Sequence, residues 1–378
     1  MENLDLFLEI LSIDSSSSRE KMLSDFLAGR FKTEKNTLRR FPVGVSEENP
    51  DGDGTENLLF CWGEPRVVFC THLDTVPPYF PPAVSVEAPC ADGREHLKVT
   101  GRGSCDANGQ IIAMFNACLA LEKKGCTDFA LLLLAGEEVG SYGAKSFSRA
   151  VNSGEIKLPE GAYVIVGEPT GNAMVSACKG TKSFEVTFRG KSCHSGYPEN
   201  GESAVDMFVD FVSALRSVEF PEDPLLGKTT WNIGRLSSTN PQNILSPSLG
   251  LRIYFRTTFV SDGIVENLMR NMAGEEAVLR FGASVPGKCR DEVASWQKGM
   301  SVKAFGGDTP MEYTVFPGFE TTPAAFGSDA PQLAGFSHRS LCGPGSILVA
   351  HTMDEFVRVD DLEKATAQYI RMYEEASK

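Results

Sequence analysis

Short apolar runs that end in a histidine or a carboxylate recur along this chain of 378 residues. The first run covers residues 67–69 and leads to His72 and Asp74. Three more runs, 129–134, 163–166 and 347–350, lead to Glu137 with Glu138, to Glu168 and to His351. Apolar runs of this length are typical of buried strands in a parallel sheet. Because ligands of open α/β sheets bind beyond the carboxyl ends of the strands, the four runs predict one shared site.

Helix and strand patterns alternate through the first part of the chain. Apolar residues at helical spacing predict two amphipathic helices within residues 4–32. Residues 110–124 are apolar on nearly every side, which predicts a buried helix, and residues 57–62 add a further strand. This alternation is typical of an α/β domain whose mostly parallel sheet is covered on both faces.

The pattern changes after Gly180. Alternating apolar and polar residues predict strands over 183–188, 229–235, 249–259 and 277–283, and helical spacing predicts helices over 203–218 and 265–272. Such alternation indicates an antiparallel sheet with helices on one side. We therefore expect an α+β unit over residues 179–288, inserted into a first domain made of residues 1–178 and 289–378.

Composition and charge narrow the class of protein. The formal net charge of −14 argues against a nucleic-acid or anionic-membrane partner. No apolar stretch approaches the roughly 18 residues of a membrane span, and the first residues are acidic where a signal peptide is basic. The ten cysteines lack the close paired spacing of a zinc ribbon or a disulfide framework. We therefore expect a cytoplasmic protein with reduced thiols.

The polar residues that follow the predicted strands, together with Asp106, match the needs of a two-metal site. Two ions about 3.5 to 4 Å apart can be held by two histidines, two terminal carboxylates and one bridging carboxylate. Mixed imidazole and carboxylate ligands suit Zn²⁺ in a catalytic site. The candidate ligands are His72, Asp106, Glu138, Glu168 and His351.

Two carboxylates remain beside these ligands. Asp74 lies two residues after His72 on a strand, so both side chains project to the same face and Asp74 can accept the ring proton of His72. The alternative is an acid that only begins the following loop. Glu137 adjoins Glu138 and can carry a proton from a reacting water to a leaving nitrogen. Its alternative is a solvated surface acid.

Motifs in a fixed order span almost the full length of the chain. They cover residues 71–77 (Thr-His-Leu-Asp-Thr-Val-Pro), 101–106 (Gly-Arg-Gly-x-x-Asp), 134–138 (Leu-Ala-Gly-Glu-Glu), 167–170 (Gly-Glu-Pro-Thr), 194–198 (His-Ser-x-x-Pro) and 343–356. This set resembles the M20 family of co-catalytic zinc peptidases and deacylases. That family includes acetylornithine deacetylase, succinyl-diaminopimelate desuccinylase and the bacterial glutamate carboxypeptidases.

The resemblance implies a phosphorylase/hydrolase-like catalytic domain with two Zn²⁺ ions per subunit, for which Co²⁺ is a possible substitute. It implies one ion held by His72, Asp106 and Glu168, and the other held by Asp106, Glu138 and His351. It further implies that Asp74 supports His72, that Glu137 is the general acid/base, and that the Asp106-Ala107 peptide bond is cis.

For the inserted unit, the resemblance implies a lid through which a homodimer forms. His194 corresponds to the family's histidine that enters the partner subunit's site and stabilises a tetrahedral oxyanion. Arg256 and Asn243 lie in segments that resemble the family's contacts with a substrate carboxylate, and Lys179 resembles the basic residue that opens the lid. The alternative for Arg256, Asn243 and Lys179 is a solvated polar side chain without a role in the site, and the alternative for His194 is a loop histidine.

The resemblance implies a substrate that is a small N-acyl amino acid or a dipeptide. The sequence of the motif at residues 343–356 is most similar to that of acetylornithine deacetylase. Deacetylation of acetylornithine is therefore the leading expectation. A dipeptidase, aminopeptidase or carboxypeptidase of the same family is the first alternative, and an inactive binding paralogue is the second. The chain departs from the family at Asn108 and Gln110, which replace positions of the usual Lys-Gly-Gly.

Overall fold

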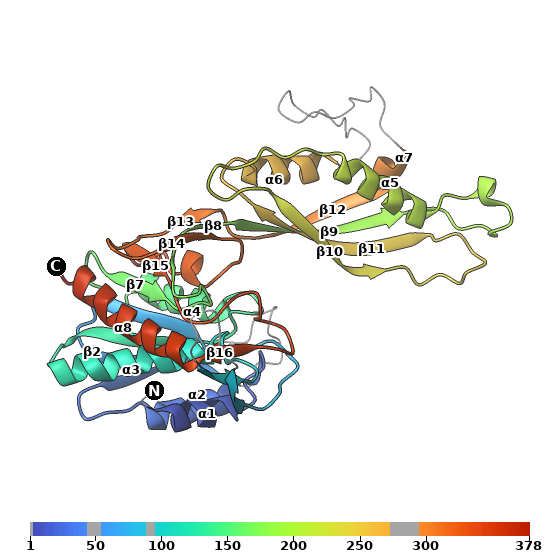
Figure 1. Ribbon diagram of the computed structural model, residues 1–378. Helices are drawn as coiled ribbons and strands as arrows, with labels where there is room; N and C mark the ends of the chain where they lie inside the picture. Colours follow the sequence, from blue (N-terminus) through green and yellow to red (C-terminus); the bar gives the residue numbers. More distant parts are fainter. Residues whose placement is uncertain (1–2, 44–53, 88–94, 273–294) are drawn as a thin grey trace. The chain divides into compact units, whose positions relative to one another are not determined.

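The computed structural model describes residues 3–43, 54–87, 95–272 and 295–378. The chain divides into two compact units (Figure 1). Unit 1 comprises Met1–Ser176, Tyr313–Thr322 and Ser328–Lys378, and unit 2 comprises Ala177–Glu312 and Pro323–Gly327.

Unit 1 is built on a mixed sheet with the strand order β1-β2-β6-β3-β7-β15. The strands are β1 (Thr37–Pro42), β2 (Glu56–Gly63), β3 (Val67–His72), β6 (Asp128–Leu134), β7 (Tyr163–Val166) and β15 (His338–Leu341). Strands β6, β3, β7 and β15 are parallel to one another, whereas β2 pairs antiparallel with β6 and β1 pairs antiparallel with β2 at one edge. The predicted α/β class with a mostly parallel sheet is therefore confirmed.

The chain order of these strands makes β3 a topological switch point. From β3 the chain crosses to β6 on one side and then returns to β7 on the other side. In open α/β sheets the two neighbouring connections diverge at such a point and leave a crevice at the carboxyl ends of the strands. The strand that ends in His72 therefore lies where this architecture favours a binding site.

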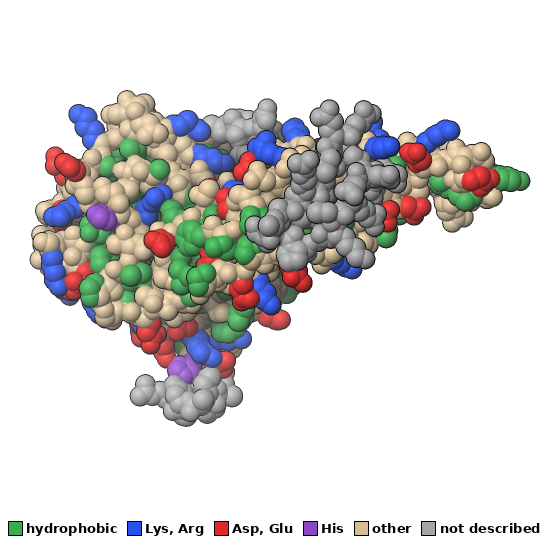
Figure 2. Space-filling model, turned by 90° about the horizontal axis from the view of Figure 1, so that it is seen from above, with side chains coloured by type: hydrophobic (Ala, Val, Ile, Leu, Met, Phe, Trp, Pro, Cys, Tyr) green, Lys and Arg blue, Asp and Glu red, His purple; other side chains and the backbone are tan. Residues whose placement is uncertain are grey.

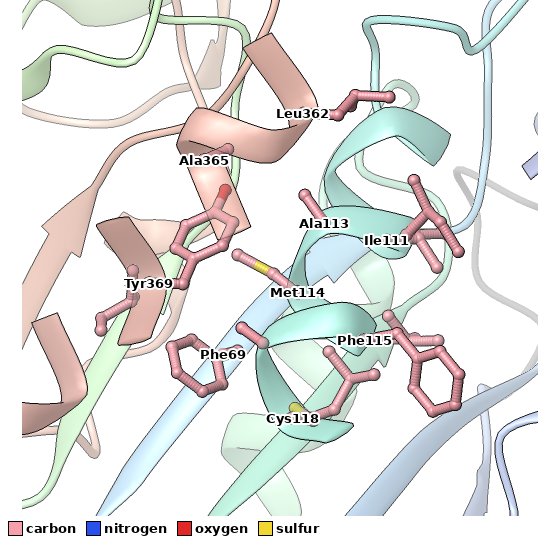
Figure 3. Close-up of a cluster of buried hydrophobic side chains, with 14 of the residues drawn as sticks. Phe69, Ile111, Ala113, Met114, Phe115, Cys118, Leu362, Ala365 and Tyr369 are labelled. Atoms are coloured by element: carbon pink, nitrogen blue, oxygen red, sulfur yellow. The ribbon is translucent and has the colours of Figure 1, made fainter. Parts of the chain in front are cut away.

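Helices cover this sheet and bury its apolar side chains. They are α1 (Leu4–Leu11), α2 (Lys21–Arg30), α3 (Asn108–Lys124), α4 (Tyr142–Asn152) and α8 (Val359–Ala376), with a short 3-10 helix η2 (Ala330–Gln332). Figure 3 shows Met114 of α3 and Tyr369 of α8 meeting over Phe69 of β3. The alternate residue, Val68, lies with Phe147 of α4, as expected when neighbouring strand residues face opposite sides.

Two small three-stranded sheets accompany the large ones, one within unit 1 and one whose residues are divided between the two units. Strands β16 (Phe356–Arg358), β5 (His96–Thr100) and β4 (Ala83–Glu87) form an antiparallel sheet in that order. Strands β13 (Met311–Glu312), β8 (Met174–Cys178) and β14 (Thr321–Ala324) form another, and the chain passes between the two units along β8 and β14.

Unit 2 is an antiparallel sheet in the order β10-β11-β9-β12 with helices packed against one face. Its elements are β9 (Gly180–Arg189), η1 (Pro198–Asn200), α5 (Ala204–Arg216), β10 (Thr230–Ser237), β11 (Ser248–Thr257), α6 (Asp262–Asn271), α7 (Ser295–Lys298) and β12 (Met300–Gly306). Phe184, Phe188, Phe211 and Phe255 lie in its core. The predicted strand over 277–283 lies outside the described residues.

The division into units differs from the expected domain limits at one end. The chain enters unit 2 at Ala177, two residues before the predicted start at 179. It returns to unit 1 at Tyr313, whereas the prediction placed the return at 289. The reason is β12, which pairs with β9 as a further strand of the unit 2 sheet. Its exposed residues 303–306 give no alternation to mark them as a strand.

On the face shown in Figure 2, Asp and Glu side chains lie among Lys and Arg side chains without a continuous basic area. Within the described parts of the chain, no helix combines the length and the apolar character needed to cross a membrane.

Candidate metal centre

Three parallel strands deliver polar side chains at the same edge of the unit 1 sheet. His72 is the last residue of β3, Glu137 and Glu138 follow β6, and Glu168 follows β7. Gly136 makes the turn after β6 possible, because it has a φ of 66° and a Cβ at this position would overlap the Tyr142 ring. The sequence prediction for these three strands is confirmed.

Asp106 lies between the two candidate histidine ligands. Its Oδ1 is 3.1 Å from Nε2 of His72, and its Oδ2 is 3.3 Å from Nε2 of His351. His351 Nε2 is also 2.8 Å from Oε1 of Glu138. The two oxygens of one carboxylate thus face two different imidazoles, which is the arrangement a carboxylate bridging two ions requires. The Asp106-Ala107 peptide bond is cis, as expected.

His351 reaches this cluster from a turn, so the expected strand over 347–350 is wrong. The turn follows Gly343-Pro344-Gly345, and His351 itself has a φ of 63°, a left-handed conformation that a strand does not contain. Leu348 is 84% exposed although Ala350 lies in the core, so the run is not buried on both faces as a central strand is. The strand that extends the sheet is instead β15, which ends at Leu341 before the Gly-Pro-Gly segment.

The electrostatics of the cluster favour added positive charge. Burial and neighbouring carboxylates raise the pKa values of Glu137, Glu138 and Glu168 above those of ordinary glutamates. Contacts with Asp106 and Glu138 raise the pKa of His351 to about 10. Burial alone would raise the pKa of Asp106, but its contacts with His351 and His72 lower it.

This donor set fits divalent metal ions. Donor atoms of His72, Asp106 and Glu138 all lie within 4.8 Å of one another, close enough to share one ion. Glu168 is buried, and its Oε1 has no hydrogen-bond partner among the described residues. A buried oxygen without a donor is costly unless a ligand satisfies it. Carboxylate oxygens and imidazole nitrogens are ligands that Zn²⁺ accepts.

Asp74 has a different principal contact from the one expected. Nδ1 of His72 lies 2.9 Å from the backbone carbonyl oxygen of Asp74 and 3.4 Å from its carboxylate Oδ1. The carboxylate itself accepts the backbone N–H of Glu137 at 2.9 Å and that of Glu138 at 3.1 Å. It also accepts the hydroxyl of Ser17 at 2.8 Å. Asp74 therefore fixes the turn that carries Glu137 and Glu138 and also adjoins His72.

The four other candidate residues lie in unit 2, where they form two pairs. His194 forms an isolated β-bridge with Ile244, and the carbonyl of Asn243 accepts the N–H of Ser195 at 3.0 Å. Asn243 is exposed. Burial and the charge of Arg256 lower the pKa of Lys179, so these two cations form the other pair.

Asp329 is a buried carboxylate near the centre that the sequence patterns did not single out. Its side chain is almost fully buried, and its charge contributes to raising the pKa values of Glu137 and Glu168. It precedes the short helix η2 in a turn after Gly327 and Ser328, so no apolar run marks it. A Gly-Ser-Asp sequence without a neighbouring strand was the only available signal.

Comparisons with known proteins agree with one another. The model of peptidase family M20/M25/M40 matches residues 68–375. A probable carboxypeptidase from Emericella nidulans is 31% identical over 394 residues, which cover 98% of this chain and 88% of that protein.

Solved structures show the same fold. A tripeptidase from Staphylococcus aureus superposes with a TM-score of 0.73 at 17% identity, covering 99% of this chain and 98% of that one. An M20 family metallo-carboxypeptidase from Sulfolobus solfataricus superposes with a TM-score of 0.70 at 16% identity, covering 100% of this chain and 99% of that one. At these identities the likeness concerns the fold alone.

The role of Asp74 as an acceptor of backbone N–H groups can be tested locally. In Asp74→Asn one neutral side-chain oxygen remains, so one of the amides of Glu137 and Glu138 loses its acceptor, a loss of about 1 to 3 kcal/mol, and the other keeps only an uncharged one. We expect faster amide hydrogen exchange in the segment 135–141, measured by mass spectrometry. Ser17→Ala, which removes only the hydroxyl contact, serves as the control. Unchanged exchange in Asp74→Asn would contradict this role.

Proposed function

The chain belongs to peptidase family M20/M25/M40, and from this premise we propose that it is a two-metal hydrolase that releases a C-terminal amino acid from small peptides. The position of Asp106 carries this proposal, because its two oxygens face the imidazoles of His72 and His351. If Asp106 were shared between two ions, each of these imidazoles would have an ion of its own to ligate.

The proposed ligands divide into two sets that share Asp106. His72, Asp106 and Glu168 would hold one Zn²⁺ ion, and Asp106, Glu138 and His351 would hold the other, with Co²⁺ as a substitute. When bound, such ions lower the pKa of a water molecule and polarise a carbonyl oxygen.

Glu137 is the proposed general acid/base. Glu137 follows β6, and its backbone N–H donates to the carboxylate of Asp74. The backbone of Glu137 is therefore fixed beside the proposed ligands. Burial and the charge of Glu168 raise its pKa well above the ordinary value. Because its pKa is raised, the ionised carboxylate of Glu137 is a stronger base than an ordinary glutamate, and its protonated form can give the proton on. It would take a proton from the attacking water and give one to the leaving nitrogen.

His194 is the proposed donor to the developing oxyanion. Its Nδ1 accepts the backbone N–H of Gly196 at 3.1 Å. In the neutral ring the proton is therefore on Nε2, which leaves that nitrogen as a hydrogen-bond donor. Preorganised donors of this kind stabilise tetrahedral intermediates.

We further propose that unit 2 is a lid through which a homodimer forms, so that His194 acts in the partner's site. Strand β10 lies at the edge of the unit 2 sheet. Val205 and Val209 of α5 lie four residues apart on one side of the helix and are 38% and 53% exposed. An open strand edge and an exposed apolar stripe on the same unit are features that association with a second copy would cover.

Two cations support recognition of a substrate carboxylate. Among the described residues, neither Arg256 nor Lys179 has a carboxylate within 4.0 Å. The ammonium of Lys179 donates to the carbonyl of Lys228, and the guanidinium of Arg256 lies 5.0 Å from the centre of the Tyr254 ring. A guanidinium can bind a carboxylate through two parallel hydrogen bonds, which suits the free C-terminus of a peptide.

Deacetylation of an N-acyl amino acid such as acetylornithine is the second candidate. The motif at residues 343–356 favours it, whereas the name of the Emericella nidulans relative favours a carboxypeptidase. Both reactions cleave an amide whose nitrogen belongs to an amino acid with a free carboxylate. A hydrolysis panel of acetylornithine, N-blocked dipeptides, free dipeptides and their C-terminal amides separates the two. Faster turnover of acetylornithine than of any peptide would replace the first proposal by the second.

Glu137→Gln separates proton transfer from metal binding. We expect this variant to bind two Zn²⁺ ions, measured by elemental analysis, and to lose about 10² to 10⁴ in kcat, because only the general acid/base is removed. Asp106→Ala is the contrasting variant and should lose metal together with activity. Nearly full turnover of Glu137→Gln in zinc-replete buffer would show that another group moves the proton.

Arg256→Met tests recognition of the carboxylate. A hydrogen bond to a charged group contributes about 1.5 to 3 kcal/mol, so KM for a peptide with a free C-terminus should rise by about tenfold or more. KM for the corresponding C-terminal amide should not change. Arg252→Met is the matched control, because Arg252 lies on the same strand two residues from Tyr254, with its guanidinium 3.9 Å from the centre of the Phe305 ring. Equal effects of the two substitutions would refute the assignment.

Mixed dimers test whether His194 acts in trans. We expect His194→Ala and Glu137→Gln to be nearly inactive separately and to regain part of the activity when co-expressed, because one of the two sites then has both groups. Activity of tagged, purified heterodimers is the measurement. A monomer with full activity, seen by light scattering during assay, would rule out this arrangement.

A further inference from the structure

A buried ion pair lies next to the loop that carries Asp106. Nη1 of Arg102 is 2.6 Å from Oε2 of Glu355, and both side chains are 1% exposed. The two residues are 253 positions apart in the sequence. Neither is among the proposed metal ligands or the proposed proton carrier.

The second oxygen of Glu355 holds the backbone of the Asp106 loop. Oε1 accepts the N–H of Cys105 at 3.1 Å and the N–H of Asp106 at 3.2 Å. The carbonyl of Glu355 accepts the N–H of Gly101 at 3.3 Å. One residue therefore anchors both the start and the end of the loop from Gly101 to Asp106.

Arg102 is itself held in place on three sides. Its Nε donates to the carbonyl of Pro78 at 3.2 Å, and its backbone N–H donates to the carbonyl of Phe80 at 3.2 Å. The guanidinium carbon lies 5.1 Å from the centre of the Phe80 ring. Arg102 thus fixes Glu355, and through it the peptide units that precede the Asp106 side chain.

The connection extends to a second proposed ligand. Glu355 follows His351 by four residues, at the end of the turn that presents this histidine. Gly345, at the start of the same segment, comes so close to Cys105 that an added Cβ would lie 2.6 Å from the Cys105 Cβ. The loop of Asp106 and the segment that leads to His351 are therefore in close contact.

A gain in the stability of the fold does not explain why the charged side chains of Arg102 and Glu355 are buried. Desolvation of an ion pair can cost as much as its attraction returns, and apolar side chains of similar size often stabilise a fold equally well. The specific contribution here is geometric, because a carboxylate that accepts two successive N–H groups sets the direction of the residue that bears them.

We propose that Arg102 and Glu355 form a positioning pair that holds Asp106 between its two metal ions and keeps His351 in register with it. The proposal rests on the two-metal function proposed above. Glu355 accepts the backbone N–H of Asp106, so the pair acts through the backbone of that residue. Partners that orient metal ligands typically change metal affinity by about 10- to 100-fold when they are substituted.

The test is the Zn²⁺ affinity of the metal-depleted protein, measured by competition with a chelating dye for each of the two ions. Glu355→Ala and Arg102→Met should bind Zn²⁺ about 10- to 100-fold more weakly. Arg102→Lys, which keeps the charge, should regain part of this loss. The absorption spectrum of the Co²⁺-loaded protein gives a second readout, because its visible bands report coordination geometry and should change in the same variants.

Two controls separate positioning from general destabilisation. Glu87→Gln weakens a partly exposed ion pair, that of Glu87 with Arg358 at 2.7 Å, in which neither partner is a proposed ligand. Leu27→Ala removes a buried side chain of α2 and lowers the melting temperature without touching the site. Both should retain the Zn²⁺ affinity of the unsubstituted protein. If Glu355→Ala does not fold, the Zn²⁺ affinities of Glu355→Gln and Arg102→Lys are compared with that of the unsubstituted protein instead.

The outcomes are distinct. If the unsubstituted protein binds fewer than two Zn²⁺ ions, the two-metal function fails. If it binds two and the Arg102 and Glu355 variants bind them equally well, the positioning pair is refuted while the function stands. Weakening of the same size in Leu27→Ala would also refute it, because the effect would then follow stability alone.

Discussion

The candidate metal centre depends on two buried carboxylates. Each of them accepts the N–H groups of two successive backbone residues. Asp74 holds Glu137 and Glu138 in this way, and Glu355 holds Cys105 and Asp106. The turns beyond the strand ends have no ladder of hydrogen bonds to fix them, and their N–H groups need acceptors once they are buried. An ionised acceptor forms bonds roughly twice as strong as a neutral one. The backbone positions of Glu137, Glu138 and Asp106 are therefore set by neighbours that are not themselves proposed ligands.

This way of fixing the turns adds negative charge to a region already rich in carboxylates. Asp329 adds a further buried acid, and burial together with the charges of Glu168 and, to a smaller extent, Asp329 raises the pKa of Glu137. Each such group costs desolvation energy and repels its neighbours. Divalent cations at the proposed site would offset both costs, so the arrangement that gives geometric precision would also favour metal binding. The proposed proton carrier then needs no separate device to raise its pKa.

Secondary structure that depends on neighbouring residues could be predicted from the sequence. Contacts between residues far apart in the chain could not. Apolar runs identified β3, β6 and β7, because a strand buried on both faces needs an unbroken apolar stretch. The same rule failed at 347–350, where Gly-Pro-Gly and the left-handed His351 make a turn. Strand β12 was missed because its exposed half has no alternation. The roles of Arg102 and Glu355 were missed because their contact joins segments 253 residues apart, which periodicity does not detect.

The same geometry explains why a motif and a relative's name can favour different substrates while agreeing on the centre. Release of a C-terminal residue and removal of an acyl group both cleave an amide whose nitrogen belongs to an amino acid with a free carboxylate. The proposed ligands and Glu137 act on the amide, and the cation pair of Arg256 and Lys179 suits the carboxylate. Both features are common to the two reactions, so neither discriminates between them. The choice between the two substrates would have to come from side chains around the acyl group. Those side chains are not the proposed metal ligands, so they can vary without disturbing the ligands.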